Sequence, residues 1–488
     1  MAEEKTQATQ PPREGGMEAP TRYPLDWHND EFYDRAALDE EMRRQFDVCH
    51  GCRRCFNLCD SFPRLFDLID ESETGELDSV DSKGFPAIEE ACTLCDMCFM
   101  TKCPYVPPHE FNLDFPHLML RARAVALHEK GRAPFVQSQL AQMDRNGKLA
   151  GTIAPLANWG SKRENHLTRP LMDKALGIDK NATLPQFAGK TFIKRFSENP
   201  PTPNPMARNP KTPNPNNQTK QDKKAKPRKA ALYATCYVNY NNPETGEAAA
   251  SVLAHLGVDV SAHYLGCCGM PFLEQGNLAK VAKQARTLAA QLRPLIDEGH
   301  DIITLTASCG LMFKFEWPLI VPDDENVQAL AAATRDICEY IVDIANKEGL
   351  AEGLQPMTQG ISVHLACHAR AQNVGPKAAE LLRLIPDTKL NIIERCAGHG
   401  GTFGVLKPTH KIAMKQGKPT ARQAAKTNNP MLVSECPLAA KHIVHGIENL
   451  NENANQNPNE NLPQAAHPVV IFARAYGLCK SKNGDANA

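Results

Sequence analysis

Cysteine is the residue type whose spacing in this sequence points most directly to chemistry. One run, from Cys49 to Cys59, fits C-x2-C-x2-C-x3-C, and a second, from Cys92 to Cys103, fits C-x2-C-x2-C-x4-C and is followed by Pro104. Three thiolates at successive intervals of three residues can fold around one Fe4S4 cube, while the fourth thiolate reaches a second cube. We therefore predict two 4Fe–4S clusters. Structural zinc is the alternative, but it usually takes two C-x2-C pairs separated by a spacer.

The exchange of the fourth cysteine between the two runs assigns the predicted ligands. Cluster I would take Cys49, Cys52, Cys55 and Cys103. Cluster II would take Cys92, Cys95, Cys98 and Cys59. The departure from the motif is Asp60, which follows the first run where a proline follows the second.

The C-terminal half holds a cysteine pattern that occurs twice. Its first copy is Cys236, the pair Cys267–Cys268 and Cys309, and its second copy, roughly 130 residues further along, is Cys367, Cys396 and Cys436. Each of these cysteines follows or lies near the end of a short apolar segment, such as LYATC or VHLAC, and helical stretches separate the segments. This alternation predicts a mainly parallel sheet, whose strands end along one edge, so the cysteines would converge there.

The chemistry of these convergent cysteines stays open between three hypotheses. The first copy could supply four thiolates to a third iron–sulfur cluster, which soft thiolate ligands favour. Alternatively, the three cysteines of the second copy combine with the first in a shared site at a pseudo-twofold interface. The remaining hypothesis is that they are redox-active or buried thiols without a metal. Cys338 and Cys479 stand outside the pattern, and we predict a core thiol and an incidental one.

Helices are expected to position the N-terminal cysteines, because apolar residues recur there at spacings of three and four. The full chain has 488 residues, enough for several domains. The predicted organisation is a disordered tail at 1–35, an α-helical domain with both 4Fe–4S clusters at 36–125, a helical extension at 126–195, a Pro/Asn/Lys-rich linker at 196–229, two α/β repeats at 230–350 and 358–450, a polar linker at 451–466, and a C-terminal tail at 467–488.

Composition narrows the classes of function. A formal net charge of -1 gives no field that would favour nucleic acid, and no apolar run is long enough to span a bilayer. The first residues lack the apolar core of a secretory signal, so we expect a cytoplasmic protein whose 17 cysteines are ligands or redox groups rather than disulfides. Peripheral association with the inner face of the cytoplasmic membrane is a further hypothesis. The sequence shows no G-x-G-x-x-G after a strand and no P-loop, so any flavin is expected on a partner.

On these residues the chain resembles the iron–sulfur proteins with CCG cysteine-rich domains, a family that includes the C subunit of anaerobic glycerol-3-phosphate dehydrogenase and heterodisulfide reductase-related proteins. The resemblance implies an α+β multidomain fold, in which an α-helical ferredoxin-like dicluster domain precedes two α/β CCG repeats. The sequence departs from the family where Ala397 replaces the second cysteine of the pair. Neither repeat has the five cysteines of a noncubane cluster, so the resemblance does not imply that cluster here.

The function expected from these features is that of an iron–sulfur electron-transfer subunit of an oxidoreductase. A flavin-containing or other dehydrogenase subunit would deliver electrons, which would pass through the two 4Fe–4S clusters to the CCG centre and on to a quinone or another carrier. The resemblance implies a small hydroxy acid or polyol phosphate as the upstream substrate class. The alternative is a CCG active site that directly reduces a disulfide or related thiol substrate. A third hypothesis, a zinc-stapled interaction scaffold, predicts a colourless protein.

Overall fold

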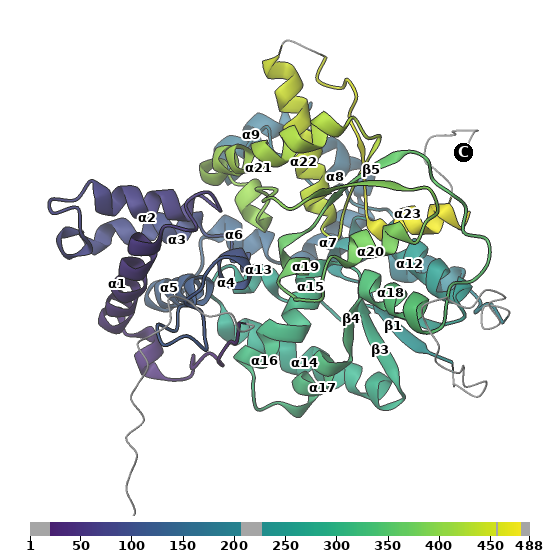
Figure 1. Ribbon diagram of the computed structural model, residues 1–488, viewed down its shortest axis with the longest axis horizontal. Coiled ribbons are helices and arrows are strands. Elements are labelled where there is room, and N and C mark those ends of the chain that lie inside the picture. The colour runs from purple at the N-terminus through teal and green to yellow at the C-terminus, as the bar shows by residue number, and fades with distance from the viewer. Residues whose placement is uncertain (1–19, 206–226, 455–456, 480–488) are drawn as a thin grey trace, which may run out of the picture.

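The computed structural model describes residues 20–205, 227–454 and 457–479 and contains two parallel β-sheets among many helices (Figure 1). The strand orders are β2-β1-β3-β4 in one sheet and β6-β5-β7-β8 in the other, and every pair is parallel. The strands are β1 (Lys229–Tyr233), β2 (Asp259–His263), β3 (His300–Thr304), β4 (Thr334–Asp336), β5 (Gly360–His364), β6 (Lys389–Ile393), β7 (Met431–Ser434) and β8 (Gln464–Ala466). The second order repeats the first, strand for strand. The predicted parallel α/β character of the C-terminal half is therefore confirmed.

Helices connect these strands, as parallel pairing requires. The helices of the C-terminal half are α11 (Cys236–Tyr240), α12 (Pro243–His255), α13 (Met270–Leu273), α14 (Leu278–Asp297), α15 (Ala307–Leu311), α16 (Trp317–Ile320), α17 (Glu325–Ala333), α18 (Ile337–Lys347), α19 (Cys367–Arg370), α20 (Lys377–Arg383), α21 (Lys407–Thr427), α22 (Pro437–Asn453) and α23 (Pro468–Ala475). In α14, buried residues such as Leu278, Val281 and Ala285 recur at intervals of three and four, so one face packs on the sheet. The Asn277 side chain caps the first turn by accepting from the Lys280 amide.

The N-terminal half is helical over its described residues. Its helices are α1 (Arg35–Cys52), α2 (Ser61–Asp70), α3 (Phe85–Ala91), α4 (Met97–Thr101), α5 (Phe115–Lys130), α6 (Phe135–Leu140), α7 (Met143–Thr152), α8 (Ala154–Ser161), α9 (Thr168–Leu176) and α10 (Phe192–Glu198). Aromatic side chains hold the first helices together, with Phe46 edge-on to Phe85 at 5.1 Å and Phe62 against Phe115 at 4.7 Å. None of the helices in the described parts of the chain is both long and apolar enough to cross a bilayer.

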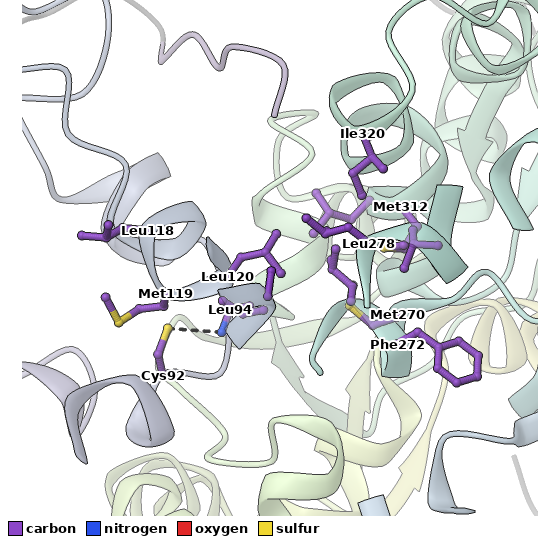
Figure 2. Close-up of a cluster of buried hydrophobic side chains, with 14 of the residues drawn as sticks. Cys92, Leu94, Leu118, Met119, Leu120, Met270, Phe272, Leu278, Met312 and Ile320 are labelled. Carbon is purple, nitrogen blue, oxygen red and sulfur yellow. Dashed lines mark hydrogen bonds between the residues drawn. The ribbon is translucent and has the colours of Figure 1, made fainter. Parts of the chain in front are cut away.

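One hydrophobic core joins the N-terminal half to the first sheet. Figure 2 shows Leu94, Met119 and Leu120 on one side of this core and Met270, Leu278 and Met312 on the other. Arg123 of α5 crosses the same junction and donates hydrogen bonds to the carbonyls of Glu89 and Glu274, both at 3.0 Å. The N-terminal helices are therefore fixed against the first sheet, which decides where their cysteines lie.

Residues 20–34 differ from the predicted disordered tail. The Arg22 guanidinium pairs with Asp96 at 2.7 Å, Asp114 at 2.8 Å and Glu316 at 3.3 Å. The Trp27 indole is buried and donates to the carbonyl of Ile320 at 2.8 Å. Polar composition suggested disorder, but this segment is held by carboxylates and a carbonyl that distant parts of the chain supply. Residues 1–19 of the predicted tail lie outside the described residues.

Two short strands also depart from the predicted organisation. β8 lies inside the predicted polar linker at 451–466 and pairs in parallel with β7, while β4 was not expected as a strand. Each has three residues, too few for an alternating pattern to stand out. Most of the predicted linker at 196–229 falls on residues 206–226, which are outside the described ranges, as are 455–456 and 480–488.

Candidate metal centres

The first run of cysteines lies at the end of α1. Cys49 and Cys52 occupy its last turn, and Arg53 follows with a left-handed φ of 52°, which turns the chain toward Cys55. Cys103 is remote in sequence but lies beside them. Burial and then the charges of Cys103 and Cys52 raise the pKa of Cys55 to about 12. The structure therefore brings together Cys49, Cys52, Cys55 and Cys103.

The second group forms around a tightly turned loop before α4. Within it, Leu94 and Asp96 have φ values of 49° and 64°, a left-handed conformation that costs energy in residues with a Cβ. The turn lets the Leu94 amide donate to the Cys92 sulfur at 3.5 Å. Burial first, and then the neighbouring Cys92, raise the pKa of Cys59 to about 12. The residues that meet here are Cys59, Cys92, Cys95 and Cys98.

The third group follows the ends of β1, β2 and β3. Its four thiols, Cys236, Cys267, Cys268 and Cys309, lie close together in this order, and each alters the pKa of the next. The neighbouring Cys268 lowers the pKa of Cys309, but burial and the other sulfurs outweigh it, so this pKa is raised. The Trp317 indole covers the group and donates to the Cys268 carbonyl at 3.1 Å. Strands far apart in sequence thus deliver four thiols to one edge of the first sheet.

The fourth group, Cys367, Cys396 and Cys436, occupies the matching positions after β5, β6 and β7. Burial and the charges of its two companions raise the pKa of Cys367. The group lies against the second group, because His368 is 3.4 Å from the Leu94 carbonyl and Gly400 abuts Thr93. It also meets the third group, where Gln372 donates to the carbonyl of Ala307 at 3.0 Å. The second copy therefore lies between the other thiols.

Two side chains that contact these groups carry no signal in the sequence. Asp144 of α7 accepts a hydrogen bond from the Cys267 amide at 3.2 Å and another from the Tyr264 hydroxyl. Arg22 anchors the cysteine loop through Asp96. Both come from segments without a cysteine motif, so only the folded chain reveals them. His364, by contrast, hydrogen-bonds Ser434 at 3.0 Å and the Arg395 carbonyl at 3.0 Å, which is a structural role.

The donor sets suit iron–sulfur clusters. Each of the first three groups offers four sulfurs, and thiolates become stable ligands when a metal core offsets their mutual repulsion. A hydrogen bond to sulfur, such as the one that Leu94 donates, is also a recognised influence on cluster potential. Across residues 20–205, 227–454 and 457–479, no three His, Cys, Asp or Glu side chains converge tightly enough to hold a single metal ion.

Comparison with known proteins agrees with the duplicated pattern. Residues 230–314 and 361–440 each match the family described as CCG, cysteine-rich domain. The C subunit of anaerobic glycerol-3-phosphate dehydrogenase of Escherichia coli K12 is 26% identical over 319 residues, which cover 64% of this chain and 74% of the relative. Lactate utilization protein A of Bacillus pumilus is 30% identical over 186 residues, 36% of this chain and 75% of the relative. The B subunit of fumarate reductase (CoM/CoB) of Methanothermobacter marburgensis is 29% identical over 224 residues, 44% of this chain and 42% of the relative.

Proposed function

We propose that this chain is the electron-transfer subunit of an oxidoreductase. The premise is that it belongs to the CCG cysteine-rich domain family, together with lactate utilization protein A and the C subunit of anaerobic glycerol-3-phosphate dehydrogenase. The names of two relatives describe subunits of a dehydrogenase and of a reductase. A dehydrogenase partner is accordingly part of the proposal, and a quinone is the proposed final acceptor. Attachment to the membrane would be peripheral.

The observation that carries the proposal is the unbroken succession of thiol groups. Cys98 of the second group lies close enough to Cys55 of the first for the charge of Cys55 to raise the pKa of Cys98. Cys95 is likewise a neighbour of Cys367, and Cys436 is a neighbour of Cys309. Ligands of a redox chain need such proximity, whereas structural thiols do not. The succession runs from the N-terminal helices to the edge of the first sheet.

The residues proposed to hold 4Fe–4S clusters are the first group for cluster I, the second for cluster II and the third for a third cluster. When bound, these clusters supply one-electron redox chemistry. The chain contributes the thiolates, the burial that excludes water, and hydrogen bonds to the sulfurs. The α-helical ferredoxin domain at 36–125 and the repeats at 230–350 and 358–450 belong to this proposal.

Iron and acid-labile sulfide analysis of anaerobically purified full-length protein tests the proposal, with EPR of the dithionite-reduced sample. About twelve irons per chain are expected for three cubane clusters. About eight irons per chain would mean that only the two N-terminal clusters are present and would exclude the third cluster. Negligible iron with tightly bound zinc would refute the proposal.

A second measurement decides the acceptor. The reduced protein is mixed with a short-chain quinone or with a small disulfide, and reoxidation is followed by absorbance. Fast reoxidation by the quinone alone is expected. Reoxidation by the disulfide alone, with stoichiometric thiol release, would instead establish the CCG active site as a disulfide reductase.

A further inference from the structure

Large apolar side chains are exposed along residues 149–171, on and between α7, α8 and α9. We call this set the apolar stripe, and its residues are Leu149, Ile153, Leu156, Trp159, Leu167 and Leu171. Leu156 is 61% exposed and Trp159 is 51% exposed, values that are unusual for large apolar side chains. Two further exposed apolar residues, Phe135 and Leu176, lie on α6 and at the end of α9, and the others in the described residues come from separate segments. The stripe therefore marks a surface that another phase or molecule should cover.

Spacing within each helix relates the members of the stripe. Leu156 and Trp159 are three apart on α8, and Leu167, the residue before α9, is four from Leu171. Leu149 lies on α7, and Ile153 lies at the junction of α7 and α8. The opposite faces are packed, since Ala154 and Ser161 are buried and Gly147 abuts the ring of Tyr240. A helix with one packed face normally presents polar residues to water on the other. On its exposed face α8 presents Leu156 and Trp159, and α7 and α9 present leucines beside their lysines.

The charges around the stripe are mainly positive. Exposed cations are Arg145, Lys148, Lys162, Lys174 and Lys180, whereas Glu164 is the exposed acid of residues 143–180. Of the other three acids, Asp144 accepts from Tyr264, Asp173 pairs with Lys407 at 2.5 Å, and the half-buried Asp179 accepts from the Asn181 amide. The full chain has a net charge of only -1, so this concentration of cations is local. It complements an anionic surface.

We propose that the apolar stripe docks this protein on an anionic phospholipid bilayer. An amphipathic surface with leucines, a tryptophan at the headgroup level and flanking lysines is what interfacial binding requires. α7 ties the stripe to the redox groups, because Asp144 on the same helix reaches the Cys267 amide at 3.2 Å. Docking would hold the third thiol group close to the bilayer, where a quinone dissolves. The use of this surface to reach a quinone rests on the proposed function.

Tryptophan fluorescence offers a direct test, because Trp27 and Trp317 are buried and Trp159 is exposed. Titrating the full-length protein with vesicles of phosphatidylcholine and phosphatidylserine should shift the emission to shorter wavelength. Vesicles of phosphatidylcholine alone should give a weaker response. The variant Trp159→Phe should lose the shift but still sediment with anionic vesicles. No shift and no co-sedimentation at low salt would overturn the proposal.

Matched variants locate the surface. Leu156→Glu should lower the fraction bound by at least about tenfold, since it places a charge in the apolar stripe. Phe111→Glu, a control at a residue that is 38% exposed on another part of the surface, should leave binding unchanged. Removing cations with Lys148→Ala and Lys174→Ala should weaken binding about fivefold each. Equal losses in Leu156→Glu and Phe111→Glu would refute the location.

Two further outcomes separate this inference from others. Light scattering that shows a dimer, which Leu156→Glu dissociates, would mean that a second copy covers the stripe and would overturn the proposal. Vesicle binding needs no iron, so iron analysis of the same sample judges the proposed function independently. Twelve irons without vesicle binding would reject only the docking surface, and vesicle binding without iron would reject only the electron-transfer role.

Discussion

The two CCG repeats have the same strand order but present their thiols to different neighbours. In the first repeat, at 230–314, four thiols lie close enough for each to alter the pKa of the next. In the second, at 361–440, Ala397 occupies the place of the second paired cysteine, and Cys396 is exposed. Its thiols lie near one another and also near Cys95 and Cys59 of the N-terminal half, while Cys436 lies near Cys309 of the first repeat. The same scaffold therefore gathers four thiols within the first repeat, whereas in the second repeat it places three thiols beside the N-terminal half.

The loop after Cys396 explains part of this difference. Gly398, Gly400 and Gly401 all have left-handed backbones, with φ values of 78°, 51° and 58°. Each packs against another element: Gly398 against α21, Gly400 against Thr93 and Gly401 against Glu274. Because the backbone at these three glycines lies so close to its neighbours, a side chain would not fit there. The second repeat uses this loop to meet the N-terminal half and the first repeat, whereas the first repeat closes on its own thiols.

The largest expected difference between the repeats is in bound iron. Cys268→Ser should remove the third cluster and lower the iron content from about twelve to about eight per chain, because it takes a thiolate from a closed set of four. Cys396→Ser should leave the iron content unchanged. Metal analysis and EPR of both variants check this, with Cys338→Ala as a control for altering a buried thiol outside the four groups. Equal loss of iron in both serine variants would show that the second repeat also holds a cluster.

The glycine that follows each cysteine position should differ in its tolerance of alanine. At Gly398 a Cβ would lie 2.1 Å from the Ala413 carbonyl oxygen, which is backbone and cannot yield easily. At Gly269 it would lie 2.9 Å from the Oε1 atom of Gln284, a side chain that can move. Both positions have a left-handed φ, so an alanine at either would add strain of about 1–2 kcal/mol. Gly398→Ala should lower the free energy of unfolding by about 3–4 kcal/mol and Gly269→Ala by about 1–2 kcal/mol.

Urea denaturation, followed by circular dichroism, measures this difference. The two alanine variants serve as controls for each other, because the residue change and the backbone conformation are alike. A Gly269→Ala variant as unstable as Gly398→Ala would contradict the assignment of the larger cost to contact with the α21 backbone.

Much of the strand pattern could be predicted because the strands that carry the cysteines are apolar and bounded by clear breaks. β1, β2, β3, β5, β6 and β7 overlap the short apolar segments that precede the cysteines. The three-residue strands β4 and β8 could not be recognised, since they are too short to show a pattern. The ordered segment around Arg22 was missed because its partners, Asp96, Asp114 and Glu316, come from distant parts of the chain.

For the candidate site, spacing anticipated which cysteines meet but not how the groups meet. Cys103 does lie with the first run, as the motif suggests, although its role as a ligand stays a prediction. The approach of Cys367 to Cys95 depends on where α19 docks between α4 and α15. No local pattern encodes that docking. The sequence does not predict the role of Asp144 for the same reason, because its contact with Cys267 joins two segments far apart in sequence.

Acid should destabilise the second repeat before the first. Burial lowers the pKa of His442 to about 4 and that of His445 to about 3, with nearby His410 adding to both shifts and Arg163 to that of His445. These pKa values lie below about 6.5, the ordinary value in an unfolded chain. As the pH falls below 6.5, the unfolded state therefore binds protons that the folded state does not bind. Stability is therefore intact above pH 6.5 and falls toward pH 4, by about 3 kcal/mol at pH 5.5 for the pair.

Hydrogen exchange at pH 7.5 and 5.5 measures this effect after correction for intrinsic rates. Peptides from α21 and α22 should lose protection at the lower pH, while those from α14 keep it, since no buried histidine lies within 230–314 of the described chain. His445→Gln should reduce the loss by about 1.4 kcal/mol, the share of one histidine. Equal loss in both repeats, or no effect of His445→Gln, would contradict the histidine explanation.

The smallest expected effect concerns Asp144, which the second repeat does not match. Its carboxylate lies beside the third thiol group, where it accepts from the Cys267 amide at 3.2 Å. Asp144→Asn removes a negative charge, so the reduced and more negative state of a cluster there should become easier to reach. The midpoint potential of the third cluster should rise by on the order of tens of millivolts, with iron content unchanged. An EPR-monitored redox titration measures the shift, and Asp173→Asn, on α9 and paired with Lys407, is the control. An identical shift in the control would assign the effect to net charge, and a loss of iron would mean that Asp144 holds the thiols in place instead.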